Sequence, residues 1–431
     1  MSYKRGMMQE TRRHPGAGQQ VIIIGAGIVG LTSAWWLAEA GYKVTVLERN
    51  EQVAIAASYR NGGQLSYRYV APLADAGVPL KALAWMLQKD GPLRFRPEAD
   101  WRQWRWLASF LRNCNAASNA RTTAKLLELG ELSRTGMAQL ELSMLPDAYA
   151  WRDAGKLIVY RSPAIFQRAV ARPESEEARI VLTPAQAVQR EPALAALQGA
   201  LAGGIFTQGE AVADCHAFCQ LLTARLLQHP NFALLLKGEA RQFMTNRGKI
   251  TGVDTSLGLL EADHYVLAAG IQSRDLAATA GIYLPLYPLK GYSLNAPIRA
   301  QDLAPEISIT DFERKVLYAR IGNSLRVAAM VDMVGADTRI DAGRIAGLTR
   351  LAREAMPQAA DYEQATAWAG LRPATPNSAP LVGPSKYSNL WLNVGHGPLG
   401  FTFAAGTARI LADLMTGEAP PFALDFLSPS R

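Results

Sequence analysis

Three glycines and one acidic residue near the N-terminus have the types and the spacing that bind a dinucleotide. Gly25, Gly27 and Gly30 form a GxGxxG pattern, and Glu48 follows Gly30 by eighteen residues. The first glycine permits a tight turn, the second lets the backbone approach a pyrophosphate, and the third lets a helix pack closely on a strand. The carboxylate of Glu48 would accept hydrogen bonds from adenosine ribose hydroxyls and would repel a 2′-phosphate, so this pattern disfavours NADP.

These residues can act together only if two strands and a helix position them. The β-branched run at residues 21–24 predicts the first strand, and residues 43–47, which end at Glu48, predict the second. The helix between them would direct its N-terminal N–H groups and the positive end of its dipole at the diphosphate. The predicted cofactor contacts in this unit are Gly25, Ala26, Gly27, Ile28, Val29, Gly30, Glu48 and Arg49.

Two other interpretations of this segment are weaker. Residues 21–38 carry no charge and approach the length of a transmembrane helix. A signal peptide behind Arg12 and Arg13 is the second alternative, but its cleavage would remove the glycine pattern. Three glycines at turn spacing argue against a membrane span, so we expect the protein to remain in the cytoplasm. Residues 1–19 are expected to form a disordered basic tail.

A loop of small residues at positions 56–66, AASYRNGGQLS, is a second candidate for cofactor contact. Its two glycines allow close backbone approach, although NGG is also an ordinary turn signal. In a flavin site such a loop would flank the ribityl chain and the ring. Residues 268–270 end a predicted strand in the AxG form that returns the chain to the cofactor sheet of flavoproteins. The predicted contacts from these two segments are Ser58, Asn61, Gly62, Gly63, Gln64, Ala269 and Gly270.

A third glycine-rich segment, GHGPLGFT, follows a predicted strand at residues 390–394. Its glycines again satisfy GxGxxG, which could imply a second nucleotide site, but no second strand ending in an acid follows it. The helix that it opens would instead point at the pyrimidine edge of a flavin, where N1 and O2 become anionic on reduction. The predicted contacts are Gly395, Gly397, Leu399, Gly400, Phe401 and Thr402.

Composition limits the remaining functional classes. The chain has 431 residues, 49% of them hydrophobic, which suits two domains with ample core. Cys114, Cys215 and Cys219 fit a reducing compartment and are too few for a four-cysteine iron–sulfur cluster. Cys215 and Cys219 lack a matching His or Cys pair, so we predict buried core cysteines and no metal site.

The net charge of +8 suggests an anionic partner. No basic run or basic–aromatic repeat resembles a nucleic-acid module, so we predict no nucleic-acid binding. Residues 101–112 form a predicted amphipathic helix, with Trp101 and Trp104 on one face and Arg105 and Arg112 on another. Such a helix could lie on an anionic membrane surface, and a helix packed on the core with a solvated basic face is the alternative.

The pattern of elements predicts an α/β protein in which a Rossmann domain encloses an inserted substrate domain. Alternating apolar and polar positions between residues 283 and 335 predict an antiparallel sheet. The expected divisions are a tail at 1–19, cofactor-domain segments at 20–80, 201–282 and 361–431, and substrate-domain segments at 81–200 and 283–360.

Several longer motifs make the comparison with known proteins specific. GAGIVG, SYRNGGQLS, VPLKALAWML, LYPLKGYSL, AGLRPATPNSAPLVG and LWLNVGHGPLGFTFAAG occur in this order. Together they resemble the bacterial FAD-dependent D-amino-acid dehydrogenases of the D-amino-acid oxidase superfamily, over about residues 20–425. The resemblance implies a glutathione-reductase-like FAD domain, with an antiparallel substrate sheet covering the flavin ring. The motifs that face the ring lack cysteine, so we expect FAD to be bound non-covalently.

The resemblance also assigns residues to the substrate. The arginine of the GLRP motif, Arg372, would bind the substrate carboxylate through two parallel hydrogen bonds, whereas the alternative is a structural arginine paired with a buried acid. His396 would donate to the carboxylate or to the ring, or it would simply cap a helix. Lys290 and Tyr292 of the KGYS motif would border the active site, and packing within the sheet is the alternative for Tyr292. Gln64 and Thr402 would lie near the ring and the carboxylate.

Two departures from the family pattern bear on the substrate. Tyr67 and Arg68 stand where proline and glycine are usual, and Asn377 and Ser378 stand where the family has Asp-Gly. Side chains at 67 and 68 are expected at the mouth of the pocket, and Arg68 would favour an acidic substrate if it pointed inward. A cyclic or secondary amine is the other alternative.

The expected reaction is oxidation of a D-amino acid at Cα, with hydride passing to flavin N5 and the imino acid hydrolysing to a 2-oxo acid and ammonia. The resemblance favours a quinone over oxygen as the external electron acceptor. Residues 85–112 would then contact the inner face of the cytoplasmic membrane. Alternatives are a dehydrogenase or oxidase subunit for hydroxy-D-proline, opines or N-methyl amino acids, a flavin monooxygenase, and a nucleotide-binding regulator without turnover.

Overall fold

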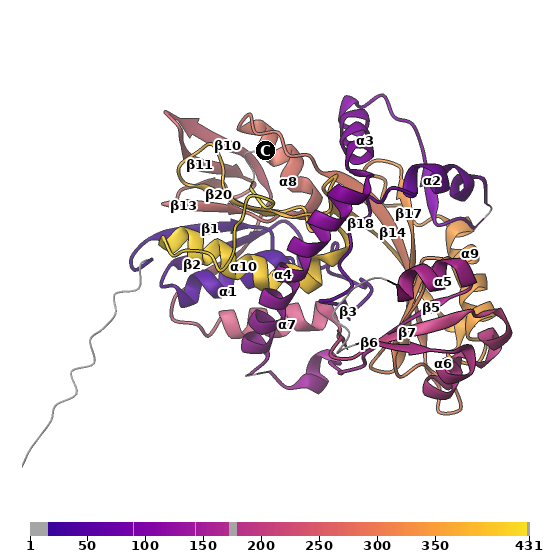
Figure 1. The fold of residues 1–431 in the computed structure, drawn as a ribbon. Helices are drawn as coiled ribbons and strands as arrows, with labels where there is room; N and C mark the ends of the chain where they lie inside the picture. The colour runs from indigo at the N-terminus through magenta and orange to yellow at the C-terminus, as the bar shows by residue number, and fades with distance from the viewer. Residues whose placement is uncertain (1–15, 89, 143, 172–178, 429–431) are drawn as a thin grey trace, which may run out of the picture.

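The computed structural model describes residues 16–88, 90–142, 144–171 and 179–428 (Figure 1). Most of the predicted N-terminal tail, residues 1–15, lies outside the described residues. Residues 16–18 form a turn, and the N–H of Gly16 donates to the carbonyl of Ala40 at 3.3 Å. The tail prediction is therefore wrong for this turn, which packs against the end of the first helix.

A six-stranded sheet with both faces covered holds the N-terminal strand near its centre. The strand order is β19-β20-β13-β1-β2-β9, and neighbours are parallel except for β19 and β20. Apolar runs form the central strands because both sheet faces are buried there, whereas the side chains of the edge strand β9 are half-buried or exposed. The strands are β1 (Gln20–Ile24), β2 (Lys43–Glu48), β9 (Phe232–Lys237), β13 (His264–Leu267), β19 (Leu381–Pro384) and β20 (Leu390–Val394).

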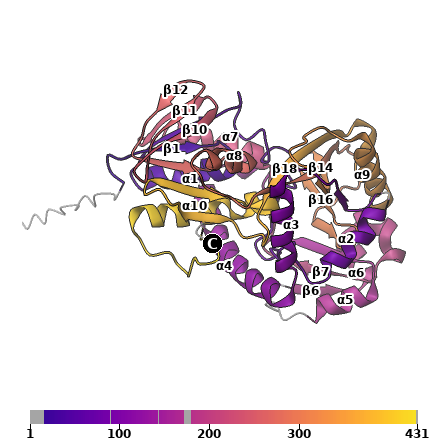
Figure 2. The same cartoon turned by 90° about the horizontal axis from the view of Figure 1, so that it is seen from above.

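Helices cover one face of this sheet, and a small sheet with one helix covers the other. Helix α10 lies beside α1 and α4 (Figures 1 and 2), and apolar side chains of these helices and of α7 form one core. These helices are α1 (Ile28–Glu39), α4 (Ala116–Glu141), α7 (Cys215–Leu226) and α10 (Gly400–Thr416). The opposite layer consists of β10 (Ala240–Asn246), β11 (Lys249–Thr255), β12 (Gly258–Leu260) and α8 (Ser273–Thr279).

A second, mostly antiparallel sheet forms the other half of the molecule. Its order is β18-β14-β17-β16-β15-β5-β7-β6, and β4 pairs with β17. The strands are β4 (Leu93–Phe95), β5 (Lys156–Tyr160), β6 (Arg179–Leu182), β7 (Gly203–Thr207), β14 (Tyr287–Pro297), β15 (Ser308–Asp311), β16 (Val316–Ile321), β17 (Ser324–Met333) and β18 (Thr366–Ala374). One face packs on α6 (Pro184–Arg190), α9 (Ala342–Ala355) and the 3-10 helix η3 (Pro192–Ala200), and α5 (Pro163–Val170) packs beside β5 and β7.

The predicted fold class, an α/β cofactor domain with an antiparallel substrate domain, is confirmed. Three elements differ from the predicted division. Strands β7 and β18 join the substrate sheet although residues 201–282 and 361–431 were assigned to the cofactor domain. Helix α4 packs in the core of the cofactor half although residues 81–200 were assigned to the substrate domain. For the two strands, the reason is that a short apolar run shows that a strand forms but does not show which distant strand it pairs with.

The shorter elements connect the two halves. Helix α3 (Trp101–Asn113) confirms the predicted amphipathic helix, which buries Gln103 and Trp106 and exposes Trp101 and Trp104. The others are α2 (Val78–Leu87), β3 (Gln64–Leu65), β8 (Ala211–Val212), η1 (Pro146–Tyr149), η4 (Gly270–Gln272), η5 (Tyr362–Gln364) and η6 (Gly397–Leu399). Within the described part of the chain, no helix combines the length and apolar character needed to cross a membrane.

Candidate active site

A cavity of about 2250 Å³ is lined by residues of both sheets. This volume exceeds that of ordinary small-molecule sites, which run to about 1000 Å³, and it leaves room for a dinucleotide together with a substrate. Of the residues predicted to bind cofactor or substrate, all except Ala26, Gly30 and Lys290 line the cavity. Segments far apart in sequence therefore meet at one site.

The three glycines of the β1–α1 turn meet different steric demands. Gly25 has φ +109°, and an added Cβ would lie 2.6 Å from the carbonyl oxygen of Ala268. A Cβ on Gly30 would lie 1.8 Å from the carbonyl oxygen of Gly25. A Cβ on Gly27 would meet only the Ser58 hydroxyl, at 3.4 Å, and would otherwise occupy cavity space. The backbone at Gly27 is thus open to a ligand, as a pyrophosphate requires.

The carboxylate of Glu48 is held firmly at the end of β2. Its Oε2 accepts from the N–H of Ala26 at 2.8 Å, and its Oε1 accepts from the backbone and side-chain amides of Asn50 at 2.9 and 2.6 Å. The N–H of Ile28 donates to the Ser58 hydroxyl at 3.1 Å, which fixes the 56–66 loop on the start of α1. The open backbone at Gly27 and this oriented acid fit the diphosphate and ribose of FAD.

The opposite part of the cavity brings together the 56–66 loop and the start of α10. The Thr402 hydroxyl donates to the carbonyl of Gln64 at 3.4 Å. The Gln64 side chain accepts from Lys156 Nζ at 2.6 Å and donates to the Ser308 hydroxyl. Helix α10 has no side-chain cap at its N-terminus, and its first residues line the cavity. The positive end of its dipole therefore faces this space.

His396 lines the cavity, but its imidazole is engaged within the protein. Its Nε2 lies 3.0 Å from the hydroxyl of Thr407, which itself donates to the carbonyl of Phe403 at 3.1 Å. Nε2 and the Thr407 hydroxyl therefore share a hydrogen bond, whose direction depends on the tautomer of the ring. Burial lowers the pKa of His396 to about 3, so the ring is neutral at physiological pH. The predicted donation to a substrate carboxylate or to the ring is not the role of Nε2, which instead ties η6 to α10.

Because His396 is buried in its neutral form, the free energy of unfolding decreases at acidic pH. Below pH 6.5 the unfolded chain protonates His396, whereas the folded chain does so only near pH 3, so stability falls as the pH drops through this window. At pH 4 this difference in the pKa of His396 lowers the free energy of unfolding by at most about 3 kcal/mol. His396→Gln should therefore show a smaller loss of melting temperature between pH 6.5 and pH 4 than the parent protein. Equal slopes in a thermal denaturation series would contradict this account of His396.

Arg372 projects from β18 into the cavity. Its guanidinium lies over Gly291 of β14, where an added Cβ would approach the guanidinium nitrogens to 2.2 Å. Its Nη1 donates to the carbonyl of Met330 at 3.1 Å. Met330 has φ +67° beside a β-bulge in β17, and this unusual conformation directs its carbonyl at Arg372. Glycine on one strand and a bulge on the next thus position the guanidinium.

Arg372 has no carboxylate within 4.0 Å among the described residues, which argues against the alternative of a structural ion pair. Burial lowers the pKa of its guanidinium to about 10, an effect that the negative charge of Asp332 partly opposes. The group therefore remains a cation at neutral pH. A cation in a cavity without an acidic partner can bind the carboxylate of a ligand.

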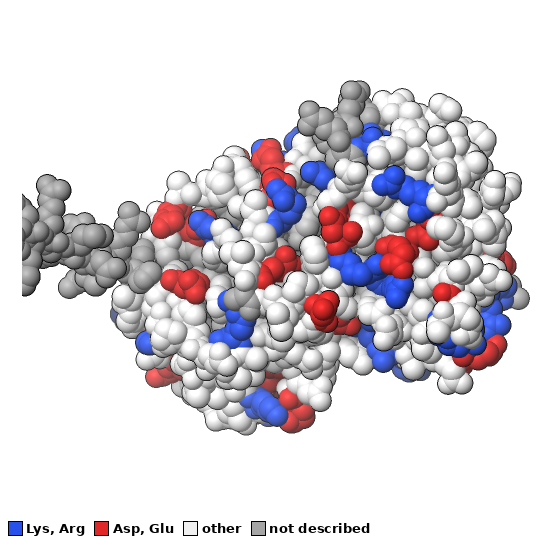
Figure 3. Space-filling view, turned by 90° about the horizontal axis from the view of Figure 1, so that it is seen from below, with Lys and Arg blue, Asp and Glu red and all other residues white. Residues whose placement is uncertain are grey.

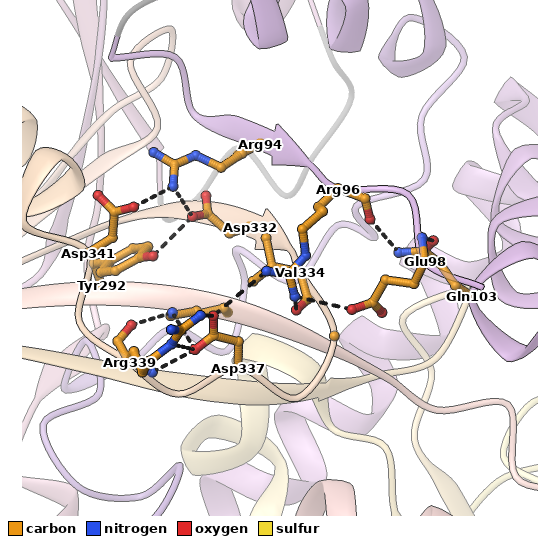
Figure 4. Close-up of polar contacts among 12 residues, drawn as sticks. Arg94, Arg96, Glu98, Gln103, Tyr292, Asp332, Val334, Asp337, Arg339 and Asp341 are labelled. Carbon is orange, nitrogen blue, oxygen red and sulfur yellow. Dashed lines mark hydrogen bonds and ion pairs between the residues drawn. The ribbon is translucent and has the colours of Figure 1, made fainter. Parts of the chain in front are cut away.

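The Lys290 side chain and the Tyr292 hydroxyl lie on the face of β14 opposite Arg372, although Tyr292 also contributes to the cavity lining. The Tyr292 hydroxyl donates to Oδ2 of the buried Asp332 at 3.0 Å, beside Arg94 and Asp341 (Figure 4). The ammonium of Lys290 donates to the carbonyl of Arg339. The prediction that Lys290 borders the active site is wrong, because alternation along β14 gives the cavity face to Leu289, Gly291 and Ser293.

The two unusual residues at 67 and 68 also lie outside the cavity lining. Tyr67 is buried in the core beside α4, where the added Cβ of Gly130 would meet its backbone. The Arg68 guanidinium donates to the carbonyl of Gln208 at 3.0 Å. The expectation that these side chains enter the pocket mouth is wrong, and Tyr69 lines the cavity instead.

Several cavity residues escaped prediction because the sequence gives no local signal for them. Met330 acts through its backbone carbonyl, which any residue could supply. Gly291 could have been recognised in KGYS, since a glycine inside a strand often marks close approach by another group. Lys315 opens the alternating run KVLYARI, a position that suggests solvent exposure, yet it lines the cavity.

Comparison with known proteins identifies the family of the chain. The family described as FAD dependent oxidoreductase (DAO) matches residues 20–414. D-amino acid dehydrogenase 2 of Pseudomonas aeruginosa is 49% identical over 94% of this chain and 96% of its own length. D-amino acid dehydrogenase 2 of Ralstonia nicotianae is 43% identical over 94% of this chain and 98% of its own length.

Solved structures show the same fold. Glycine oxidase from Geobacillus kaustophilus matches with a TM-score of 0.71 and 20% identity, over 96% of this chain and 99% of that one. L-proline dehydrogenase from P. horikoshii matches with a TM-score of 0.72 and 16% identity, over 96% and 98%. The predicted family and cofactor are thus confirmed, and the chain belongs to the FAD-dependent oxidoreductases of the DAO family.

Proposed function

We propose that the protein is a D-amino-acid dehydrogenase, which oxidises the Cα–N bond of a D-amino acid to an imine. The main structural support for this proposal is Arg372, a cation in the cavity that has no carboxylate partner among the described residues. The names of the relatives from Pseudomonas aeruginosa and Ralstonia nicotianae support the D-amino acid as substrate. Water hydrolyses the imino acid to a 2-oxo acid and ammonia, and two electrons leave with the acceptor.

The chain's own residues position the substrate. The planar guanidinium of Arg372 grips the carboxylate by two parallel hydrogen bonds, and the absence of a side chain at Gly291 leaves space for the guanidinium. The carbonyl of Met330 fixes its orientation, so that Cα is held in one place relative to the cofactor. The uncapped start of α10 stabilises negative charge that develops in the cavity. Bound FAD supplies the two-electron acceptor.

A substrate panel tests this proposal. The purified holoenzyme, with an artificial dye as terminal acceptor, should release one 2-oxo acid and one ammonia per D-amino acid and should leave the L-enantiomers unchanged. Turnover confined to sarcosine or to hydroxy-D-proline would move the assignment to N-methyl or cyclic amines. Turnover of L-enantiomers alone would contradict the proposal.

We propose that the natural acceptor is a membrane quinone, which reaches the cavity at an apolar edge formed by α2 and α3. Leu83, Met86 and Leu111 line the cavity and are also exposed. Helix α2 buries none of its side chains, and Leu80 and Leu87 are 79% and 88% exposed. The exposed arginines of α3 would favour an anionic lipid surface. On the face shown in Figure 3, by contrast, acidic and basic side chains are interspersed.

The membrane contact predicts an effect of acidic substitutions on α2. The double variant Leu80→Glu/Leu87→Glu should bind vesicles containing phosphatidylglycerol at least about tenfold more weakly, since it removes two apolar side chains and adds two negative charges. Vesicle flotation measures this. Leu257→Glu/Leu259→Glu, on exposed leucines of the small sheet, is the matched control. Equal binding by the two double variants would refute contact through α2.

A further inference from the structure

Two lysines line the cavity without acidic partners. Lys315 lies immediately before β16, and Lys81 lies on α2. Among the described residues, no carboxylate oxygen lies within 4.0 Å of either ammonium group. Cations in a cavity that lack acidic partners are available to an anionic group of a ligand.

The acids nearest Lys315 in the same turn are already engaged. Asp311 accepts from Nε of Arg161 at 2.8 Å and from the N–H of Arg314 at 3.1 Å. The two carboxylate oxygens of Glu313 accept from the N–H groups of Arg161 and Ser162 at 3.1 and 3.0 Å. These acids hold the turn in place, so they do not neutralise Lys315 by direct contact.

The conformation of Lys315 directs its side chain over the cavity wall. Its φ is +57°, a left-handed value that residues with a Cβ rarely adopt. Its Nζ lies 3.7 Å from the centroid of the Phe312 ring, and Phe312 also lines the cavity. The ammonium is therefore held against an aromatic face, where a cation is favourable but remains open to an anion.

Strand register places Lys315 beside the part of the sheet that holds Arg372. Leu317 of β16 pairs with Ala328 of β17, and two residues beyond this pair lie Lys315 on one strand and Met330 on the other. Met330 is the residue whose carbonyl accepts from Arg372. The Arg372 guanidinium reaches across β14 to Met330 of β17, and β17 is the neighbour of β16. Neighbouring strands are about 4.8 Å apart, so a small ligand held by Arg372 also lies within reach of the Lys315 side chain.

Other charges around this point favour an anion. Enclosure by the surrounding chain and repulsion from Lys81 lower the pKa of Lys315 to about 8, while Glu313, Asp75 and Asp311 act in the opposite direction. The buried ammonium of Lys156 lies behind the wall, 4.7 Å from the ring centroid of Tyr69. A carboxylate beside Lys315 would relieve the repulsion between the two cavity lysines.

From this placement we propose that the site selects D-amino acids with an acidic side chain: Arg372 binds the α-carboxylate, and Lys315, assisted by Lys81, binds the distal carboxylate. This inference rests on the proposed D-amino-acid oxidation and adds the substrate class. It moves the expected source of acidic selectivity from Arg68, which lies outside the cavity lining, to two lysines that the sequence alone did not single out.

The test compares D-glutamate with D-glutamine, which has nearly the same shape but no distal charge. The holoenzyme should prefer D-glutamate in kcat/KM by about 10- to 100-fold. Lys315→Met should abolish most of this preference, chiefly by raising KM for D-glutamate, and Lys315→Arg should retain much of it. Lys249→Met, at an exposed position outside the cavity lining, is the control and should keep the parent ratio.

Flavin content and melting temperature establish that each variant is folded. If Lys315→Met does not fold, the same comparison of D-glutamate with D-glutamine is made with Lys81→Met. Equal kcat/KM for the two substrates in the parent enzyme would overturn the inference, as would an unchanged ratio in folded Lys315→Met. Either result would leave D-amino-acid oxidation standing, because D-glutamine would still be oxidised. Failure to oxidise any D-amino acid would instead remove the proposed function as well.

Discussion

Replacing Arg372 by methionine should lower kcat/KM for D-amino acids by about 10²- to 10⁴-fold. The substitution removes two charge-assisted hydrogen bonds to the substrate carboxylate, each worth about 1.5–3 kcal/mol, and tenfold in rate corresponds to about 1.4 kcal/mol. Arg372→Lys should restore only part of the loss, because an ammonium cannot form the parallel pair of bonds. Steady-state kinetics with an artificial acceptor, at matched flavin content, measures both variants.

A matched control separates this effect from the loss of any arginine in the sheet. Arg320 lies on β16, outside the cavity lining, where it pairs with Glu306 on the surface. Arg320→Met should change kcat/KM by less than about threefold, since surface ion pairs contribute about 0–1 kcal/mol. A folded, flavin-loaded Arg372→Met enzyme with kcat/KM within tenfold of the parent would show that the carboxylate is held elsewhere.

Gly30→Ala should yield protein that lacks FAD. The new Cβ would lie 1.8 Å from the backbone oxygen of Gly25, and a backbone atom in this tight turn cannot move aside without shifting α1 from β1. The same shift displaces the helix N-terminus from the diphosphate position. The ratio of flavin to protein absorbance after purification, together with the melting temperature, measures the two effects.

Two other glycines distinguish lost packing from lost cofactor binding. Gly27→Ala meets only the Ser58 hydroxyl at 3.4 Å, so we expect a folded protein with weakened FAD binding. Gly199→Ala has no atom within 4 Å of its added Cβ and should behave as the parent. Full flavin content in Gly30→Ala would contradict the packing role that the structure gives to Gly30.

The cofactor half of the site could be predicted from sequence because its determinants are local. One βαβ unit contains all of its signals: a glycine at the turn, a β-branched strand before it and an acid at the end of the next strand. The strand at residues 390–394 and the helix after it are likewise defined by adjacent residues, and the structure has this strand with the same bounds.

The substrate half depends on contacts between strands, which the sequence leaves open. Period-two alternation groups Lys290 with Tyr292 but does not say which face of β14 meets the cavity. The bulge at Met330 depends on how β17 pairs with β14, and the direction of the Lys315 side chain depends on the turn between β15 and β16. Likewise, only the sheet topology shows that β7 and β18 belong to the substrate domain.

Anaerobic bleaching of the flavin absorbance is the most direct test of the central claim, that Arg372 presents a D-amino acid to bound FAD. In the parent protein, D-amino acids should bleach the flavin absorbance rapidly, whereas their L-enantiomers should not. In Arg372→Met, the same D-amino acids should bleach it about 10²- to 10⁴-fold more slowly at low substrate concentration. The absence of bleaching by every D-amino acid in the parent protein, or equal rates in the two proteins, would contradict the claim.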